Sequence, residues 1–261
     1  MDLTVLTEFA KFNHITYYDE PHKYYIDGIN KISATTFIGK FKPKFETDSI
    51  AEKYSEKNGL VKEMVIDEWD WKRDFSTIKG SLFHKYAEDY LSNKIFPYQA
   101  DYYQKLFGLD VLKPKFDKLT ELFHKYYNDS KDNLIPIKSE WVIGDNELGI
   151  CGCLDQIYYN LKSGMLEIWD WKTNKKITTK SDFNNRFKHP IEHLDVCEFN
   201  TYSLQLSLYK YIVENNTNLK IGNCYIVWFF EKNDNYKIFK TSDFTEEIES
   251  MIKYAKQYKW I

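Results

Sequence analysis

Long apolar runs are absent from this chain of 261 residues. A helix that crosses a membrane needs about 20 consecutive apolar residues, so we expect no membrane-spanning segment and no membrane partner. The start, MDLTVLTEFAKF, has neither an apolar signal core nor the Arg- and Ser-rich pattern of a transit peptide. A cytoplasmic location is therefore expected. Internal repeats and low-complexity tracts are absent too, and the 43% of hydrophobic residues argue against a disordered chain.

Cysteine is scarce, and its spacing does not match the usual structural uses. The four cysteines are Cys151, Cys153, Cys197 and Cys224. They form no C-x-x-C pair and no disulfide-dense pattern, so free thiols are expected at these positions. Cys151 and Cys153 share a strand face with Asp155, which leaves a metal-binding role open as the alternative. The phosphate-binding sequence G-x-x-x-x-G-K-[ST] is also missing, so we expect no ATP site of that kind.

Arginine is nearly absent, because among 36 basic residues only Arg73 and Arg186 are arginines. A bias towards lysine, with abundant Asn, Ile, Tyr and Phe, is typical of an AT-rich genome, such as that of a low-GC bacterium or of a virus that infects one. The net charge of −3 does not by itself indicate a nucleic-acid-binding protein. Lysines nevertheless cluster locally. The two clusters are Lys40, Lys42 and Lys44, and Lys172, Lys175, Lys176 and Lys180.

The length suits one domain, 1–261, in which 1–130 hold a hairpin and helices and 131–261 hold a sheet core. Asp27-Gly28, inside an alternating aromatic run, predicts a tight hairpin turn. Helices are predicted at 46–58, 66–93, about 99–128, about 199–215 and from Thr245, strands at 137–144, 150–159, 223–231 and 236–241, and an irregular loop at 174–197. This order predicts an α/β (α+β) fold, with a mixed central sheet flanked by helices and an N-terminal helical extension.

The most informative stretch runs from Leu148 to Thr173, LGICGCLDQIYYNLKSGMLEIWDWKT. If Leu161–Gly164 is its loop, the two strands pair in a register that places Asp155 opposite Asp170. Lys172 follows two residues later, and alternation along a strand puts it on the same face as Asp170. Like charges that face each other destabilise a sheet, so this pair needs a shared proton or a cation between them.

Two carboxylates and an ammonium on one sheet face suggest a hydrolytic centre with a divalent metal. Hard cations such as Mg²⁺ bind a few carboxylates together with waters and substrate phosphate. Such a cation can polarise phosphoryl oxygens, while Lys172 can orient a water or offset charge in the transition state. The alternative is a solvated surface pair, but the apolar neighbours Ile168, Trp169 and Trp171 would then half-bury both charges without compensation.

Two helical pairs are candidates for the same site. His84 and Glu88 are four residues apart and share a helix face, from which they can complete a metal sphere or hold a metal-bound water. The alternative is an ordinary surface pair. Gln205 and Tyr209 are also four apart, and a Gln amide and a Tyr hydroxyl in a cleft can fix a phosphate or a base. Amphipathic packing is the alternative for this helix, but it explains Gln205 poorly.

In chain order, the stretches GSLFHKYAEDYL, GCLDQIYY, IWDWKT and QLSLY resemble the motifs of the PD-(D/E)XK nuclease superfamily. The similar branch contains RecB-type nuclease domains, phage exonucleases and the mitochondrial genome maintenance exonuclease. Its pattern is a G-x-x-x-H-x-x-x-E helix, a G-x-x-D strand, a D-x-K-T strand and a Q-x-x-x-Y helix. The resemblance covers roughly residues 80–231 and implies a restriction-endonuclease-like core.

The resemblance also implies roles for individual residues. Asp155 and Asp170 would be catalytic metal ligands, Lys172 the catalytic lysine, and His84 an additional ligand. The backbone carbonyl of Trp171 would be a further ligand, and Glu88 would act through a water. Gln205, Tyr209 and Thr173 would contact the substrate or organise the site. Apart from the resemblance, Lys175, Lys176, Arg73 and Arg186 are candidates for phosphate contacts, because lysines follow the site and only guanidinium groups bind phosphate bidentately.

The implied activity is hydrolysis of DNA, as single strands or at duplex ends, by an exonuclease with one or two Mg²⁺ or Mn²⁺ ions, in recombination, repair or replication. Asp170 stands where much of the superfamily has Glu, although this branch accepts Asp. The cysteine spacing does not match members that carry an iron–sulfur cluster, so no cluster is expected. Three alternatives stay open: a structure-specific endonuclease on the same core, a non-catalytic DNA-binding recombination adaptor, and a glycosidase, for which facing aspartates beside a lysine lack an acid with a raised pKa.

Overall fold

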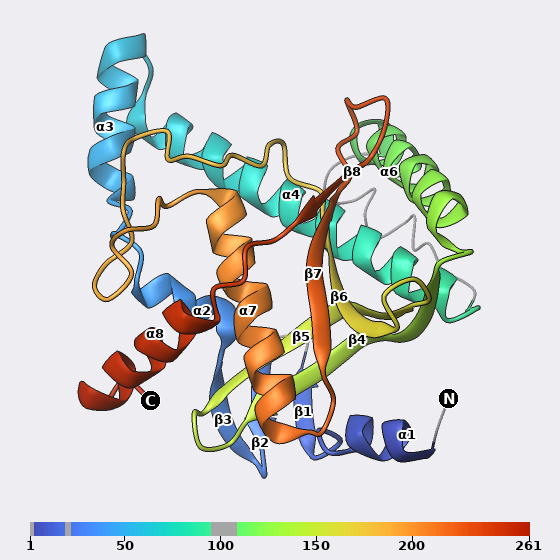
Figure 1. Ribbon diagram of the computed structural model, residues 1–261. Coiled ribbons are helices and arrows are strands. Elements are labelled where there is room, and N and C mark those ends of the chain that lie inside the picture. Colours follow the sequence, from blue (N-terminus) through green and yellow to red (C-terminus); the bar gives the residue numbers. More distant parts are fainter. Residues whose placement is uncertain (1–2, 19–21, 95–108) are drawn as a thin grey trace.

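The computed structural model describes residues 3–18, 22–94 and 109–261. These residues fold around a mixed sheet of eight strands with helices on both faces (Figure 1), so the predicted α/β class is confirmed. The strands are β1 (Ile15–Tyr18), β2 (Lys23–Ile26), β3 (Ile29–Ser33), β4 (Leu134–Asp145), β5 (Ile150–Asn160), β6 (Met165–Lys172), β7 (Ile221–Trp228) and β8 (Lys237–Lys240). The helices are α1 (Leu3–Ala10), α2 (Ala34–Lys40), α3 (Thr47–Asn58), α4 (Lys62–Leu91), α6 (Leu109–Ser130), α7 (Glu198–Asn216) and α8 (Thr245–Gln257).

The element types agree with the sequence prediction, with two additions. The prediction missed α1 and α2, which are only 8 and 7 residues long and too short for a helical period to stand out. The predicted helix at 66–93 begins earlier, at Lys62. Of the helix predicted at 99–128, the part before residue 109 lies outside the described residues.

The N-terminal hairpin turns at Asp27-Gly28, as predicted. The φ angle is 49° at Asp27 and 77° at Gly28, the left-handed pair that a two-residue hairpin turn needs. This hairpin belongs to the central sheet, because β3 pairs in parallel with the start of β5 and places Ile32 opposite Ile150. The first residues of the chain therefore extend the sheet that also carries the later strands.

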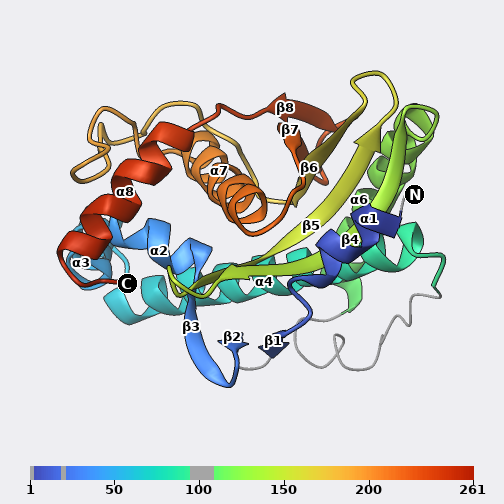
Figure 2. The same ribbon diagram turned by 60° about the horizontal axis from the view of Figure 1, so that its bottom comes forward.

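Two hydrophobic clusters cover the sheet from its two faces. On one face, Leu208 of α7 belongs to the cluster around Ile157 of β5, which also includes α8. On the other face, Phe83 of α4 and Phe123 of α6 pack around Trp171 of β6. Figure 2 shows α7 and α8 on one side of β4 and β5 and α4 on the other. The sheet is thus enclosed between two helical layers.

A gap in the strand pairing marks one edge of β5. β3 and β6 share this edge of β5. Here β3 pairs only with Ile150 and Cys151 of β5, and β6 pairs with β5 from Gln156 onwards. Among the described residues, no strand pairs with the segment between them on this side, which runs from Gly152 to Asp155. The backbone of this segment therefore has no strand partner on this edge.

A buried ion pair connects α4 to the segment that follows β7. Lys79 Nζ lies 2.8 Å from Glu231 Oε2, and Lys115 Nζ of α6 lies 3.8 Å from Glu231 Oε1. Lys79 is only 5% exposed, so water screens this pair little. Because an unpaired buried charge is costly, the pair fixes where α4 lies along the sheet.

No helix within the described ranges is both long and apolar enough to cross a membrane.

Replacing Glu231 by Gln is expected to lower the free energy of unfolding by about 3–5 kcal/mol, because Lys79 stays buried without its counter-charge. The double variant with Lys79→Met removes both charges and should be more stable than the single variant. Urea denaturation measures both. Lys72→Met, which breaks a surface pair with Glu68, is the control and should change stability by less than about 1 kcal/mol. A double variant less stable than the single one would contradict this role.

Candidate functional site

β5 and β6 pair in the predicted register as far as Gln156 and Trp169, where the ladder ends. The next two residues in this register are Asp155 and Asp170. Instead of a β5 carbonyl, the side chain of Asp155 accepts the next backbone hydrogen bond, because the N–H of Trp171 donates to Asp155 Oδ2 at 2.6 Å. The predicted register is therefore confirmed, and the two strands separate at the two aspartates.

Asp170 and Lys172 form an ion pair on one face of β6. Asp170 is only 2% exposed, and Lys172 Nζ also lies 4.6 Å from the ring centre of Tyr202 on α7, a cation–π contact. The intervening Trp169 and Trp171 pack on the opposite face, against α4 and α6. Strand alternation thus separates a charged face of β6 from an aromatic one.

His84 of α4 reaches the end of the ladder with both ring nitrogens. Nε2 lies 3.1 Å from the carbonyl oxygen of Trp171, and Nδ1 lies 3.3 Å from Asp155 Oδ1. A carbonyl only accepts hydrogen bonds, so Nε2 carries a proton and Nδ1 faces the carboxylates. Metal-binding histidines commonly donate their second N–H to a backbone carbonyl in this way. The Trp171 carbonyl, expected as a metal ligand, orients the His84 ring in this structure.

Glu140 of β4 is a site residue that the sequence interpretation missed. β4 and β5 pair on both sides of it, so Glu140 lies opposite Asp155. Its φ of 43° is uncommon for a residue other than glycine, but Glu140 keeps the alternation of β4, because it lines the same cavity as Val142 two residues later. Glu140 Oε1 lies 3.9 Å from His84 Nδ1, and Cys153 Sγ donates to Oε2 at 3.3 Å. Counting outward from the β4–β5 turn would have paired Glu140 with Asp155.

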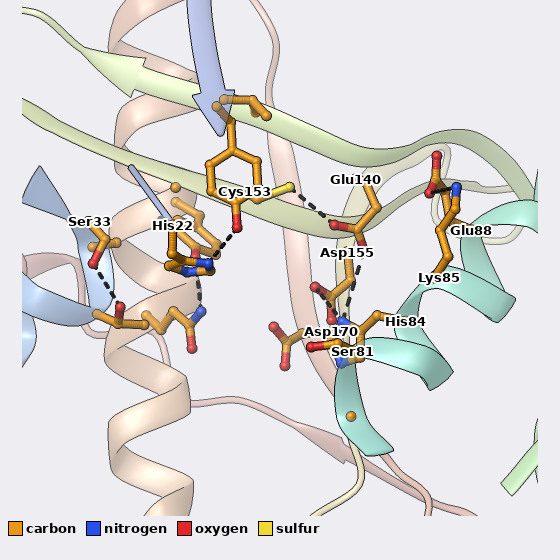
Figure 3. Close-up of a pocket in the computed structure, with 18 of the residues that line it drawn as sticks. His22, Ser33, Ser81, His84, Lys85, Glu88, Glu140, Cys153, Asp155 and Asp170 are labelled. Carbon is orange, nitrogen blue, oxygen red and sulfur yellow. Dashed lines mark hydrogen bonds and ion pairs between the residues drawn. The ribbon is translucent and has the colours of Figure 1, made fainter. Parts of the chain in front are cut away.

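Three of these side chains form a group that fits a metal ion. Figure 3 shows His84, Glu140 and Asp155 pointing toward one another, and their possible ligand atoms all lie within 4.8 Å of each other. A single ion can then lie at about 2.0–2.5 Å from each atom. Carboxylates and imidazole are both common ligands of divalent cations in proteins. Asp170, a predicted ligand, lies outside this group and is paired with Lys172.

The charges at this site perturb one another. Burial, together with Asp155, raises the pKa of Glu140 to about 7 and that of Asp170 to about 6, although Lys172 opposes the latter shift. Burial also acts to raise the pKa of Asp155, but His84 and Lys172 outweigh it and lower that pKa. For His84, burial acts to lower the pKa, but Asp155 and Glu140 prevail and raise it to about 9. An ionised Asp155 beside a protonated His84 is therefore the favoured state.

These groups line one cavity of about 590 Å³. Seven residues that were predicted from the sequence line this cavity: His84, Glu88, Asp155, Asp170, Lys172, Gln205 and Tyr209. Glu140, which was not predicted, lines it too. Glu88, expected to act through a water, is paired with Lys85 at 2.8 Å and with Lys94 at 3.5 Å. Figure 3 shows the Glu88 and Lys85 pair apart from the group of His84, Glu140 and Asp155.

Gly152 allows α7 to approach β5 closely. A Cβ at this position would lie within 3.0 Å of three atoms of the Tyr209 side chain. Tyr209 is buried, and Gln205 Nε2 donates to its hydroxyl at 2.9 Å. The glycine of the G-x-x-D pattern therefore makes room for the tyrosine of the Q-x-x-x-Y helix, three residues before Asp155.

Five predicted substrate-binding residues lie outside the cavity. They are Arg73, Arg186, Lys175, Lys176 and Thr173. Both arginines are exposed and already paired, Arg73 with Asp70 and Asp74, and Arg186 with Asp195. Lys175 and Lys176 are exposed after β6, whereas Thr173 is buried and packs against Gly80 of α4. The structure therefore does not bring these five residues together with the carboxylates.

Comparisons with known proteins leave the family of this chain unassigned. No family model and no curated protein matches it. Among solved structures, one described as "Crystal structure of SSO0001" is similar over 75% of this chain and 85% of that chain, at 11% sequence identity and a TM-score of 0.26. A likeness of this size supports no conclusion about fold or function.

Gly152→Ala is expected to lower the free energy of unfolding by about 1–3 kcal/mol, because the added Cβ must displace Tyr209. Gly39→Ala is the matched control, since a Cβ at Gly39 meets open space and alanine favours a helix such as α2. Urea denaturation of both variants tests the packing. Equal or higher stability of the Gly152 variant would contradict it.

Proposed function

We propose that this chain is a metal-dependent deoxyribonuclease of the PD-(D/E)XK type, which acts as an exonuclease. The observation that carries the proposal is the convergence of His84, Glu140 and Asp155 with the Asp170–Lys172 pair in one cavity. These residues come from helix α4 and from three adjacent strands. The order of the four sequence motifs supports the choice of DNA as substrate.

His84, Glu140 and Asp155 would hold the cation, which when bound supplies polarisation of a phosphoryl oxygen. Burial acts to lower the pKa of Lys172, but Asp170 and Asp155 raise it, so Nζ keeps its proton. An ammonium fixed there offsets the negative charge that develops on the phosphate in the transition state. Asp170 holds that ammonium in place.

Glu140 also favours a second candidate, a glycosidase. Its pKa of about 7 makes it the kind of acid that glycoside hydrolysis needs, opposite the ionised Asp155. The position of His84 argues against this function, because its Nδ1 lies 3.3 Å from Asp155 Oδ1 and 3.9 Å from Glu140 Oε1. The imidazole thus contacts both carboxyl groups, between which a glycosidase must place the glycosidic bond.

Nuclease activity is tested with end-labelled single-stranded and duplex DNA in the presence of Mg²⁺ or Mn²⁺. We expect progressive loss of nucleotides from an end, and Asp155→Ala or Lys172→Ala should slow it by about 100-fold or more. Lys162→Ala, on the exposed β5–β6 turn, is the control and should cleave normally. Cleavage that survives both site substitutions would refute the mechanism.

A covalently closed circle of the same DNA separates the two modes of cleavage. An exonuclease leaves the circle intact, whereas nicking would replace the exonuclease assignment with an endonuclease on the same site. DNA binding without cleavage under any metal condition would point to a non-catalytic adaptor.

Metal affinity should rise between pH 7 and pH 9. His84 holds a proton below its pKa of about 9, and Nδ1 must lose that proton before it can bind a metal. Titration calorimetry with Mn²⁺ in buffers of different ionisation enthalpy should therefore show proton release near pH 8. His84→Gln should weaken binding and reduce this release to the part that Glu140 supplies. Equal affinity for Mn²⁺ at both ends of the range in the unaltered protein would show that His84 is not a ligand.

A further inference from the structure

The cavity does not end at the carboxylates, but continues to the N-terminal hairpin. Its lining there consists of Tyr17 of β1, Tyr24 of β2 and His22 just before β2. Tyr17 and Tyr24 are directly opposite each other in the β1–β2 register, so their side chains lie on the same face of the hairpin. We refer to these three side chains as the hairpin wall.

The rings of the hairpin wall are held in fixed positions by one another. Tyr17 and Tyr24 are stacked, with ring centroids 4.6 Å apart and an angle of 29° between their planes. His22 meets Tyr17 edge-on at 5.3 Å, and its Nδ1 lies 2.5 Å from the Tyr17 hydroxyl. Tyr24 is 5% exposed, whereas Tyr17 is partly exposed. Of the two stacked rings, Tyr17 is therefore the one that a molecule in the cavity reaches more readily.

The hairpin wall lies close to the metal-binding group. Tyr24 lines the same cavity as Tyr209 and Cys153. Cys153 Sγ lies 3.3 Å from Glu140 Oε2, one of the possible metal ligands. A molecule that fills the cavity can thus contact the carboxylates and the hairpin wall together.

The two ends of the cavity differ in chemistry. The end with Asp155, Asp170 and Lys172 is charged, so a phosphate fits there together with a cation. The tyrosines of the hairpin wall carry no formal charge, so a phosphate gains little from them. An aromatic ring does stabilise a nucleobase by stacking, by about 1–3 kcal/mol for each base, whatever its sequence.

We propose that Tyr17, supported by Tyr24, is the stacking subsite for the nucleobase next to the phosphate at the metal-binding group. The inference rests on the proposed nuclease function and specifies its substrate, a single-stranded end. A base inside a duplex has both faces covered by its neighbours, so only a base unstacked from one of them can lie against Tyr17.

Binding tests the subsite without any need for cleavage. Thymidine 5′-monophosphate and 2-deoxyribose 5-phosphate differ only in the base, and both are titrated in the presence of Ca²⁺. We expect Tyr17→Leu to weaken binding of the nucleotide by about 5- to 100-fold and to leave binding of the sugar phosphate unchanged. Tyr17→Phe keeps the ring and should bind both nearly as the unaltered protein does.

Tyr18→Leu is the matched control. Tyr18 follows Tyr17 on the same strand, is 53% exposed and does not line the cavity. Its replacement should change neither affinity, and thermal unfolding of both leucine variants shows whether the hairpin is intact. If Tyr17→Leu weakens binding of both ligands equally, or of neither, the subsite assignment is wrong.

Cleavage provides the second test, with single-stranded DNA that carries either a normal or an abasic terminal nucleotide. The unaltered protein should cut the normal end about 5- to 100-fold faster, and Tyr17→Leu should reduce that rate to the abasic rate without changing the latter. An equal slowing of both substrates would overturn the inference. If the unaltered protein cuts neither, the nuclease function fails, and the binding experiment still decides whether Tyr17 recognises a base.

Discussion

Three carboxylates share the end of the β5–β6 ladder, and their mutual repulsion is the constraint on which the rest of the site depends. Asp155 and Asp170 are buried and Glu140 is half-buried beside them, so each is favoured either protonated or next to a cation. Lys172 is the counter-charge of Asp170, and His84 is the counter-charge of Asp155 and Glu140. The pKa shifts agree with this pairing. The pKa of Asp155 is lowered, that of Glu140 is raised to about 7, and that of Asp170 is raised to about 6. A divalent cation between His84, Glu140 and Asp155 would satisfy the same charges and take the place of the proton on His84.

The rest of the fold holds these charges in place from both faces of the sheet. On one face, Trp169 and Trp171 of β6 pack in an aromatic cluster with α4 and α6, and this packing brings His84 of α4 to the end of the ladder. On the other face, α7 places Tyr202 over Lys172 and Tyr209 over Gly152. The charged side chains thus lie in a gap between two apolar helical layers, where water screens them little.

A large part of the fold and a smaller part of the candidate site were predictable from the sequence. The register of β5 and β6, in which Asp155 and Asp170 come one step beyond the last pair, Gln156 and Trp169, followed from the turn and from alternation, because a short hairpin admits few registers. The same count on the preceding hairpin pairs Glu140 with Asp155 and would have found it, because the alternation of β4 holds through this residue despite its φ of 43°. Arg73 and Arg186 were chosen by residue type alone, and both are paired with acidic neighbours at the surface. Residue type does not reveal which way a side chain points.

The sequence by itself determined the strand order around the two aspartates, the helical pairs His84–Glu88 and Gln205–Tyr209, and the glycine that precedes Asp155. These are local properties, since a turn, a strand period and a helix period each involve a few consecutive residues. Only the tertiary structure decided that His84 faces Asp155 while Glu88 pairs with lysines, and that the hairpin near the N-terminus lines the same cavity. Those relations depend on how α4 and the hairpin pack on the sheet, and packing between distant segments is set by the shape of whole surfaces.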